Sequence, residues 1–290
     1  MSVNITNEDI NEILGTNVAD NTSSGNTFIA DSDNTENNND SVQDEHTNNV
    51  DIKILSDYGV SAMASRRYSG APWFKACSEI NVEVVGAGGI SSWTVLALSR
   101  LNLKGIYIID DDEVSAYNMA GQFFGPMNIG GHKVSELVDN VKLFSPNINM
   151  NMSRSRFYSD TSIRKYIDII ITGVDLMASR WAVYNSAKAS GFTGLYIDGR
   201  LSADTLQVIC FRFDDIKSRR RYEENYMFND MDADTTICSF KQTTYMAMMI
   251  GSVICNLVVN YANNKVNLVE YNLPFFTEYN SIKMSLEELR

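Results

Sequence analysis

The chain has 290 residues, of which 44% are hydrophobic and 21% charged, enough apolar material for a sizeable buried core. Its formal charge of −12 is concentrated at the start, because residues 1–50 hold ten Asp and Glu and no Lys or Arg. The other 26 acidic residues face 24 basic ones, so the body is nearly neutral, which excludes nucleic-acid binding through an extended basic face.

We interpret residues 1–50 as a disordered, acidic, Asn-rich tail. They contain twelve Asn and few apolar residues, so burial cannot offset the entropy of ordering them. Residues 5–15 place Ile5, Ile10 and Ile13 roughly on one helical face, as either a partner-binding helix or an occasional helical turn. The start lacks the basic and apolar regions of a signal peptide, and we expect a cytoplasmic protein.

The body, residues 51–290, alternates two kinds of run. Strand-like runs lie at 80–85, 105–110, 148–152, 167–172, 194–199 and 206–213. Helix-like runs lie at about 89–102, 131–143 and 176–190. Continuous apolar strands separated by helices predict an α/β fold: a doubly wound, Rossmann-like, mostly parallel sheet with helices on both faces.

The last third of the chain changes character twice. From Asp214 to Thr236 it is charged and polar, and we expect a mobile crossover excursion over about 214–240, with SRRR (218–221) a solvated basic cluster. The next run, 245–259, is strongly apolar, but polar residues recur every fourth position at 252, 256 and 260. A helix buried against the sheet explains that pattern better than a membrane span, so we expect no membrane association.

A glycine-rich turn follows the first strand of the body. Residues 86–93 read GAGGISSW, in which Gly86 and Gly88 allow a tight turn and Gly89 begins the next helix. Such a turn lets phosphate groups approach backbone N–H groups at the helix start, although turns of this kind also occur without a ligand. The dinucleotide fingerprint asks for a third Gly or Ala, and position 91 is Ser, so the turn alone selects no particular nucleotide.

Acidic residues follow the second strand. Asp110 lies 22 residues beyond Gly88, where an acidic side chain can accept hydrogen bonds from ribose hydroxyls. NAD enzymes and ATP-binding enzymes share this feature. Asp111 and Asp112 continue the run, and three adjacent carboxylates need a cation or open water to offset their repulsion.

From this point the sequence resembles the ThiF/MoeB/HesA family, the adenylating core shared with ubiquitin-activating enzymes. The matching motifs follow the family's order over roughly residues 66–262: G-x-G-G-I-S at 86–91, D-x-D-x-V at 110–114, N-x-x-x-Q at 118–122, I-G-x-x-K at 129–133 and D-x-x-x-x-R at 175–180. The resemblance implies a homodimeric domain over residues 51–290 that uses Mg-ATP to adenylate a carboxylate. The carboxylate is usually the C-terminus of a ubiquitin-like protein, and in some relatives a small-molecule or RNA-borne carboxylate.

The resemblance also implies roles for single residues. Asp110 would hold the ribose, and Asn118 and Lys133 would face the phosphates. Asp175 would bind Mg²⁺, for which its oxygens are suited. Without the resemblance, the alternative interpretation is that Lys133 is a surface lysine and that Asp175 caps a helix. Arg180 more readily braces the fold than contacts ATP. The nucleotide-binding positions implied are Gly86, Gly88, Gly89, Asp110, Asp112, Asn118, Gln122 and Lys133.

Two departures from the family matter. The family places an arginine before the Gln of its N-x-x-R-Q motif, and this chain has Gly121 there. Arg67, or less readily Arg66, is a candidate to supply the missing charge across a dimer, as N-terminal arginines do in family dimers. The paired CxxC motifs that bind structural zinc in many members are absent from the sequence, so we expect no zinc.

The four cysteines do not suggest a secreted disulfide framework. Cys238 precedes a Thr-Thr pair and the apolar helix, which resembles the cysteine of the enzymes that activate the ubiquitin-fold modifier. Because a helix N-terminus favours the thiolate, Cys238 is either an acyl acceptor or a buried structural cysteine. Cys210 and Cys255 are expected in the core.

Three functions remain open from the sequence. The first is ATP-dependent adenylation of a carboxylate, with possible transfer to Cys238. The second is a catalytically inactive nucleotide-binding or dimerising scaffold, which Gly121 favours. The third is an NAD-dependent oxidoreductase, which would explain residues 86–110 but neither Lys133 nor Asp175.

Overall fold

A computed structural model describes residues 68, 70–229 and 243–289, which all belong to one compact unit, Asn49–Arg290. The tail therefore lies outside the described residues. These residues form an eight-stranded sheet of order β3-β2-β1-β4-β5-β6-β7-β8. The strands are β1 (Asn81–Val85), β2 (Gly105–Ile109), β3 (Met150–Ser153), β4 (Ile169–Thr172), β5 (Leu195–Leu201), β6 (Thr205–Arg212), β7 (Phe276–Asn280) and β8 (Ser285–Leu289).

The sheet is parallel from β3 to β5 and antiparallel from β5 to β8. All residues of β1 and β4 are buried, which is why these runs are continuously apolar. Alternate side chains of β1 enter different clusters, Val84 on one face of the sheet and Val85 on the other. The expected α/β, doubly wound architecture is confirmed for the described body.

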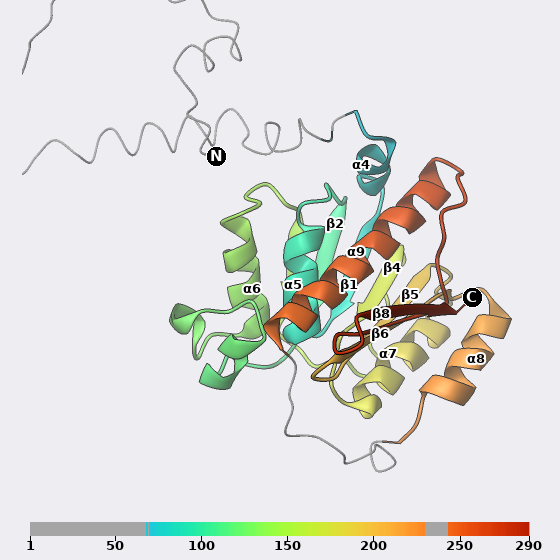
Figure 1. Cartoon of the computed structure of the whole chain (residues 1–290). Coiled ribbons are helices and arrows are strands. Elements are labelled where there is room, and N and C mark those ends of the chain that lie inside the picture. The colour runs from blue at the N-terminus through green and yellow to red at the C-terminus, as the bar shows by residue number, and fades with distance from the viewer. Residues whose placement is uncertain (1–67, 69, 230–242, 290) are drawn as a thin grey trace, which may run out of the picture. The chain divides into compact units, whose positions relative to one another are not determined.

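Helices cover both faces of the sheet (Figure 1). One face carries α4 (Pro72–Cys77), α5 (Gly89–Leu98), α6 (Lys133–Lys142) and α9 (Thr244–Val266). The other carries α7 (Met177–Ala189) and α8 (Ile216–Tyr226). Two short 3₁₀ helices, η1 (Ala116–Ala120) and η2 (Pro126–Asn128), lie between β2 and α6.

The long apolar run forms α9, which crosses the sheet beside α5 (Figure 1). By length and composition this helix could span a membrane, but 56% of its most apolar window is buried inside the fold. Ile250 and Ile254 are fully buried, whereas Ser252 and Asn256 are exposed. The recurring polar positions therefore mark the outer face of a helix that packs on the sheet.

The expectation of a mobile excursion from Asp214 is wrong for its first half, because residues 216–226 form α8. Asp215 caps this helix by accepting from the Lys217 N–H at 3.0 Å, and Tyr222 is fully buried. The basic cluster is also not simply solvated. Arg221 stacks 4.2 Å from the ring centroid of Phe275, so a cation–π contact holds it against the sheet. Residues 230–242 lie outside the described residues.

Candidate nucleotide site

The candidate site lies at the carboxyl ends of β1, β2 and β4. The chain builds β1, β2 and β3 outward in one direction and then returns to place β4 on the other side of β1. Open α/β sheets bind ligands at such a reversal of strand order, because the loops on either side diverge and leave room.

The glycine turn connects β1 to α5 at this reversal. Gly86 has φ +95°, a left-handed conformation that favours glycine, and its N–H donates to the Ile109 carbonyl at 2.8 Å. Gly88 is the N-cap of α5 and offers no side chain to the helix. A Cβ on Gly88 would meet no atom within 4 Å, so there is open space beside the N-terminus of α5, the end of a helix that suits an anion.

The two glycines are expected to respond differently to alanine. Gly86→Ala should lower the free energy of unfolding by about 1–2 kcal/mol, because an L residue in the left-handed region is strained. Its Cβ would also lie 3.3 Å from the Gly173 carbonyl oxygen. Gly88→Ala, with φ −79°, is the matched control and should cost less. Urea denaturation of both variants checks this, and equal losses would contradict it.

Ser91 occupies the position of the third glycine in the dinucleotide fingerprint. The side chain of Ser91 is fully buried, and a Cβ on Gly173 would lie 2.4 Å from its Oγ. In the dinucleotide fingerprint, a glycine on the helix allows the helix and the strand to approach closely. In this chain the glycine that allows this approach is Gly173, just after β4. Sequence reasoning missed Gly173, whose only indication was its place directly after an apolar strand.

Asp110 joins the glycine turn to the loop after β2. One carboxylate oxygen accepts from the Ala87 N–H at 2.7 Å and the other from the Asp112 N–H at 2.8 Å. Burial raises the pKa of Asp110, and these two backbone bonds and the Lys133 charge oppose that rise. Ligand oxygens of Asp110, Asp111 and Asp112 lie within 4.8 Å of one another. The fixed Asp110 carboxylate therefore stands beside the open space at Gly88.

Lys133 is the first residue of α6 and is largely buried. Its ammonium donates to Asp112 Oδ2 at 2.7 Å, and the side chains are 10% and 65% exposed respectively. The backbone N–H of Lys133 also donates to the Asp112 carbonyl, at 2.9 Å. Lys133 is thus not a surface lysine but a cation held at the edge of the site by one exposed carboxylate.

The N-x-x-x-Q frame lies on η1 and the turn after it. The Asn118 side-chain oxygen accepts from the Ser115 N–H at 2.8 Å and so caps η1. The Gln122 side-chain oxygen is buried without a hydrogen-bond partner within the described residues. Gly121 offers only its carbonyl, which accepts from the Trp93 indole N–H at 3.1 Å. The frame leaves the Gln122 oxygen available but supplies no cation.

Asp175 lies in the loop between β4 and α7 and is exposed. The alternative that it caps α7 is wrong, because the N-cap residue of that helix is Leu176. Among the described residues no hydrogen bond or ion pair of the Asp175 carboxylate is found. An exposed carboxylate at this edge has the hard oxygen atoms that Mg²⁺ prefers, so the residues present fit that ion.

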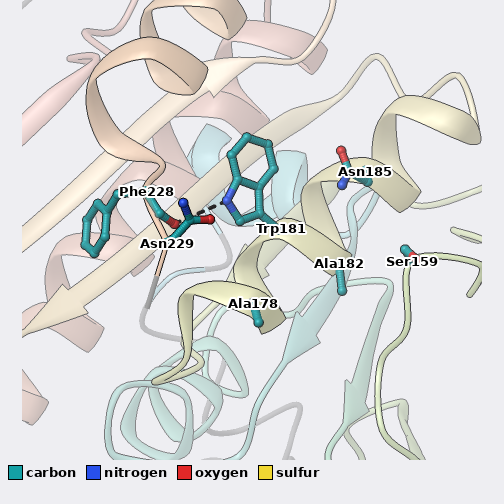
Figure 2. A pocket seen from close by; sticks show the side chains of 7 residues that line it. All are labelled: Ser159, Ala178, Trp181, Ala182, Asn185, Phe228 and Asn229. Carbon is teal, nitrogen blue, oxygen red and sulfur yellow. Dashed lines mark hydrogen bonds between the residues drawn. The ribbon is translucent and has the colours of Figure 1, made fainter. Parts of the chain in front are cut away.

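A pocket of about 370 Å³ lies over the outer side of α7 (Figure 2). Trp181 stands at its centre and donates its indole N–H to the Phe228 carbonyl at 3.3 Å. The lining residues are uncharged: Ser159, Ala178, Trp181, Ala182, Asn185, Phe228 and Asn229. The pocket begins at Ala178, about one helical turn beyond Asp175.

The cysteines of the described chain are unreactive by their surroundings. Cys77, Cys210 and Cys255 are buried and free, as expected for Cys210 and Cys255. Burial raises the pKa of Cys77 to about 12 and raises those of the other two thiols as well. Cys238, Arg66 and Arg67 lie outside the described residues.

Comparison with known proteins identifies one family model over most of the body and relatives over about half of the chain or less. A model of the ThiF family matches residues 63–290. The probable adenylyltransferase/sulfurtransferase MoeZ of Mycobacterium tuberculosis is 28% identical over 120 residues, 40% of this chain and 31% of that protein. Ubiquitin-like modifier-activating enzyme 5 of Rattus norvegicus is 24% identical over 170 residues, 52% of this chain and 42% of that protein. The chain thus matches less than half the length of these relatives.

Solved structures share the fold. Escherichia coli tRNA N6-threonylcarbamoyladenosine dehydratase, TcdA, solved with ATP, gives a TM-score of 0.55 at 15% identity over 72% of this chain and 96% of that one. Escherichia coli MccB, also solved with ATP, gives a TM-score of 0.57 at 13% identity over 86% of this chain and 79% of that one. At these identities the likeness establishes the fold alone.

Proposed function

The chain belongs to the ThiF family, and on that premise we propose that it transfers AMP from ATP to a carboxylate, giving an acyl adenylate and pyrophosphate. The observation that carries the proposal is the chain of contacts from the glycine turn to a buried cation. Asp110 binds the Ala87 N–H of the turn and the Asp112 N–H, and Asp112 binds the Lys133 ammonium. The turn that we propose for phosphate, the carboxylate that we propose for ribose and the Lys133 ammonium thus lie on one edge of the sheet.

Each residue would contribute a distinct part of the chemistry. Displacement at phosphorus asks the protein for positioning and for positive charge on the phosphate oxygens more than for covalent help. Mg-ATP brings the transferred group and the divalent charge when bound. The α5 N-terminus would receive phosphate oxygens, Asp110 would orient the ribose, Lys133 would neutralise charge, and Asp175 would hold Mg²⁺.

The remaining nucleotide contacts belong to the same proposal. Asp112 would release Lys133 toward the phosphates, and Gly89 would present its backbone to them. Asn118 and Gln122 would border the site, and the unpartnered Gln122 oxygen is a free acceptor there. Together they would enclose the nucleotide from the β2–α6 side.

The carboxylate is most often the C-terminus of a ubiquitin-like protein in the family that this chain resembles, and we propose the same class here. Relatives named as ubiquitin-like modifier-activating enzymes support this choice. A homodimer, a contribution of Arg67 across it, transfer of the acyl group to Cys238 and a cytoplasmic setting are further parts of the proposal.

A second candidate function is a nucleotide-binding scaffold without catalysis. The observation that favours it is Gly121, whose carbonyl is bonded to Trp93, so position 121 supplies no charge to the phosphates. An arginine at such a position can be worth ~10³–10⁵ in rate. Pyrophosphate exchange with supplied carboxylate partners separates an enzyme, which catalyses exchange, from a scaffold, which only binds nucleotide.

The first test is calorimetric titration with Mg-ATP and, in parallel, with NAD. We expect Mg-ATP to bind, NAD not to bind, and Asp175→Ala to weaken Mg-ATP binding about 10- to 100-fold, as loss of a charged ligand contact does. Thermal melting of Asp175→Ala should match the wild type, because the exposed carboxylate has no hydrogen-bond partner among the described residues. NAD binding, or Mg-ATP binding that ignores Asp175, would contradict the proposal.

A further inference from the structure

A buried ionic cluster lies directly behind the Asp175 loop. Its centre is Asp198 on β5, whose carboxylate is fully buried on the α7 side of the sheet. Arg180 and Arg200 both form ion pairs with this carboxylate, Arg200 at 2.8 Å. The Tyr222 hydroxyl donates to it at 2.9 Å. Two guanidinium groups share one carboxylate, so the cluster carries a net positive charge. Further hydrogen-bond acceptors are therefore needed for the remaining N–H groups of the two arginines.

Arg180 divides its N–H groups among three acceptors in two segments, strand β5 and the loop after β4. Besides Asp198, it donates to the Gly199 carbonyl at 3.1 Å and to the Val174 carbonyl. Val174 immediately precedes Asp175, so the guanidinium fixes the peptide that orients the Asp175 backbone. Burial lowers the pKa of Arg180 to about 10, which still leaves it protonated at neutral pH. A lysine ammonium would not hold the three acceptors in this arrangement, because it is a compact charge without the planar fork of the guanidinium group.

The other side of the cluster reaches the wall of the α7 pocket. Arg200 donates to the Tyr226 carbonyl at 2.6 Å, and its guanidinium carbon lies 6.0 Å from the ring centroid of Phe228. Phe228 is also bound through its carbonyl to Trp181, the residue next to Arg180 (Figure 2). The same carboxylate thus anchors the Asp175 loop, the start of α7 and the end of α8.

We propose that Arg180, held by Asp198, is a positioning residue for Mg²⁺: it fixes the β4–α7 loop so that the Asp175 carboxylate points into the nucleotide site. The inference rests on the proposed role of Asp175. Groups that orient a metal ligand typically change metal affinity 10–100-fold when they are replaced. Arg180 does not touch the nucleotide, so its effect should be confined to the metal-dependent part of binding.

The test is calorimetric binding of ATP to Arg180→Lys, with Mg²⁺ and with EDTA, and of AMP with EDTA. The ratio of the two ATP dissociation constants measures the gain due to Mg²⁺. We expect this gain to fall about tenfold or more, while AMP affinity stays within about twofold of the wild type. The control is Arg164→Lys, since Arg164 also pairs with a fully buried carboxylate, Glu83, but in the middle of β1. It should leave the Mg²⁺ gain unchanged.

The outcomes separate this inference from the proposed function. If Asp175→Ala removes the Mg²⁺ gain and Arg180→Lys preserves it, the positioning role is wrong and the nucleotide site stands. If Asp175→Ala leaves the gain intact, the metal site itself is wrong and the inference falls with it. Should Arg180→Lys fail to fold, Asp198→Asn, which keeps an oxygen for Arg180 without the charge, takes its place with the same expected loss.

Discussion

Replacing Lys133 with Ala is expected to weaken Mg-ATP binding about 10- to 100-fold, the usual value of a hydrogen bond to a charged group. The Lys133 side chain is only 10% exposed, yet within the described part of the chain its ammonium is bonded only to Asp112, whose side chain is 65% exposed. An ion pair with an exposed carboxylate stabilises the fold little, so it does not compensate for the cost of burying the Lys133 charge. A bound phosphate would offset that cost. Calorimetry with Mg-ATP measures the loss.

Lys142→Ala is the matched control, because Lys142 lies in the last turn of the same helix and is exposed. Its removal should leave ATP affinity unchanged. The melting temperature of Lys133→Ala should stay close to that of the wild type, which separates a binding defect from unfolding. Equal ATP affinities for the two variants would show that Lys133 serves only to hold the β2–α6 loop.

Much of the sheet could be predicted from the sequence because its strands are buried on both faces. The run at 80–85 and the run at 167–172 are continuously apolar, and they form the adjacent central strands β1 and β4. Helix limits for α5, α6 and α7 fell within a few residues of the expected ranges. The alternation of continuous apolar strands with helical runs is a strong enough pattern to predict a covered parallel sheet without tertiary information.

The elements that were missed depend on contacts between distant segments. The run around SRRR is as polar as a loop, and it forms α8 because Tyr222 is buried and Arg221 stacks on Phe275. The hairpin of β7 and β8 is short and half-exposed, so its pattern is too weak for prediction. Neither the stacking partner nor the sheet edge can be seen in a local window of sequence.

The candidate site was predictable as a list of positions but not as an arrangement. Spacing placed Asp110 near the glycine turn and the family resemblance placed Lys133 there, but the pair between Lys133 and Asp112 is a tertiary contact. Gly173 matters only because Ser91 faces it. The local motif could suggest that Arg180 stabilises the fold. It could not predict that its partner Asp198 also forms an ion pair with a second arginine, Arg200.

Replacing Asp198 with Ala is expected to lower the free energy of unfolding by about 3–5 kcal/mol, the usual cost of removing one partner of a buried ion pair. The change would leave the guanidinium groups of Arg180 and Arg200 in the interior without their shared counter-ion, and Tyr222 without its acceptor. Since domains are stable by only about 5–15 kcal/mol, such a loss would remove a large part of the stability of the fold.

Asp214→Ala provides a control, because Asp214 belongs to an ion pair with the same sequence separation. Asp214 pairs with Arg212, two residues away, as Asp198 pairs with Arg200, but the Asp214 side chain is 42% exposed. Its removal should cost less than about 1 kcal/mol, because water solvates both charges. Urea denaturation is the suitable measurement, since guanidinium salts would screen the ion pairs. If both variants lost the same stability, burial would not govern the strength of these pairs. Asp198 could then not be the residue that ties the Asp175 loop to β5 and α8.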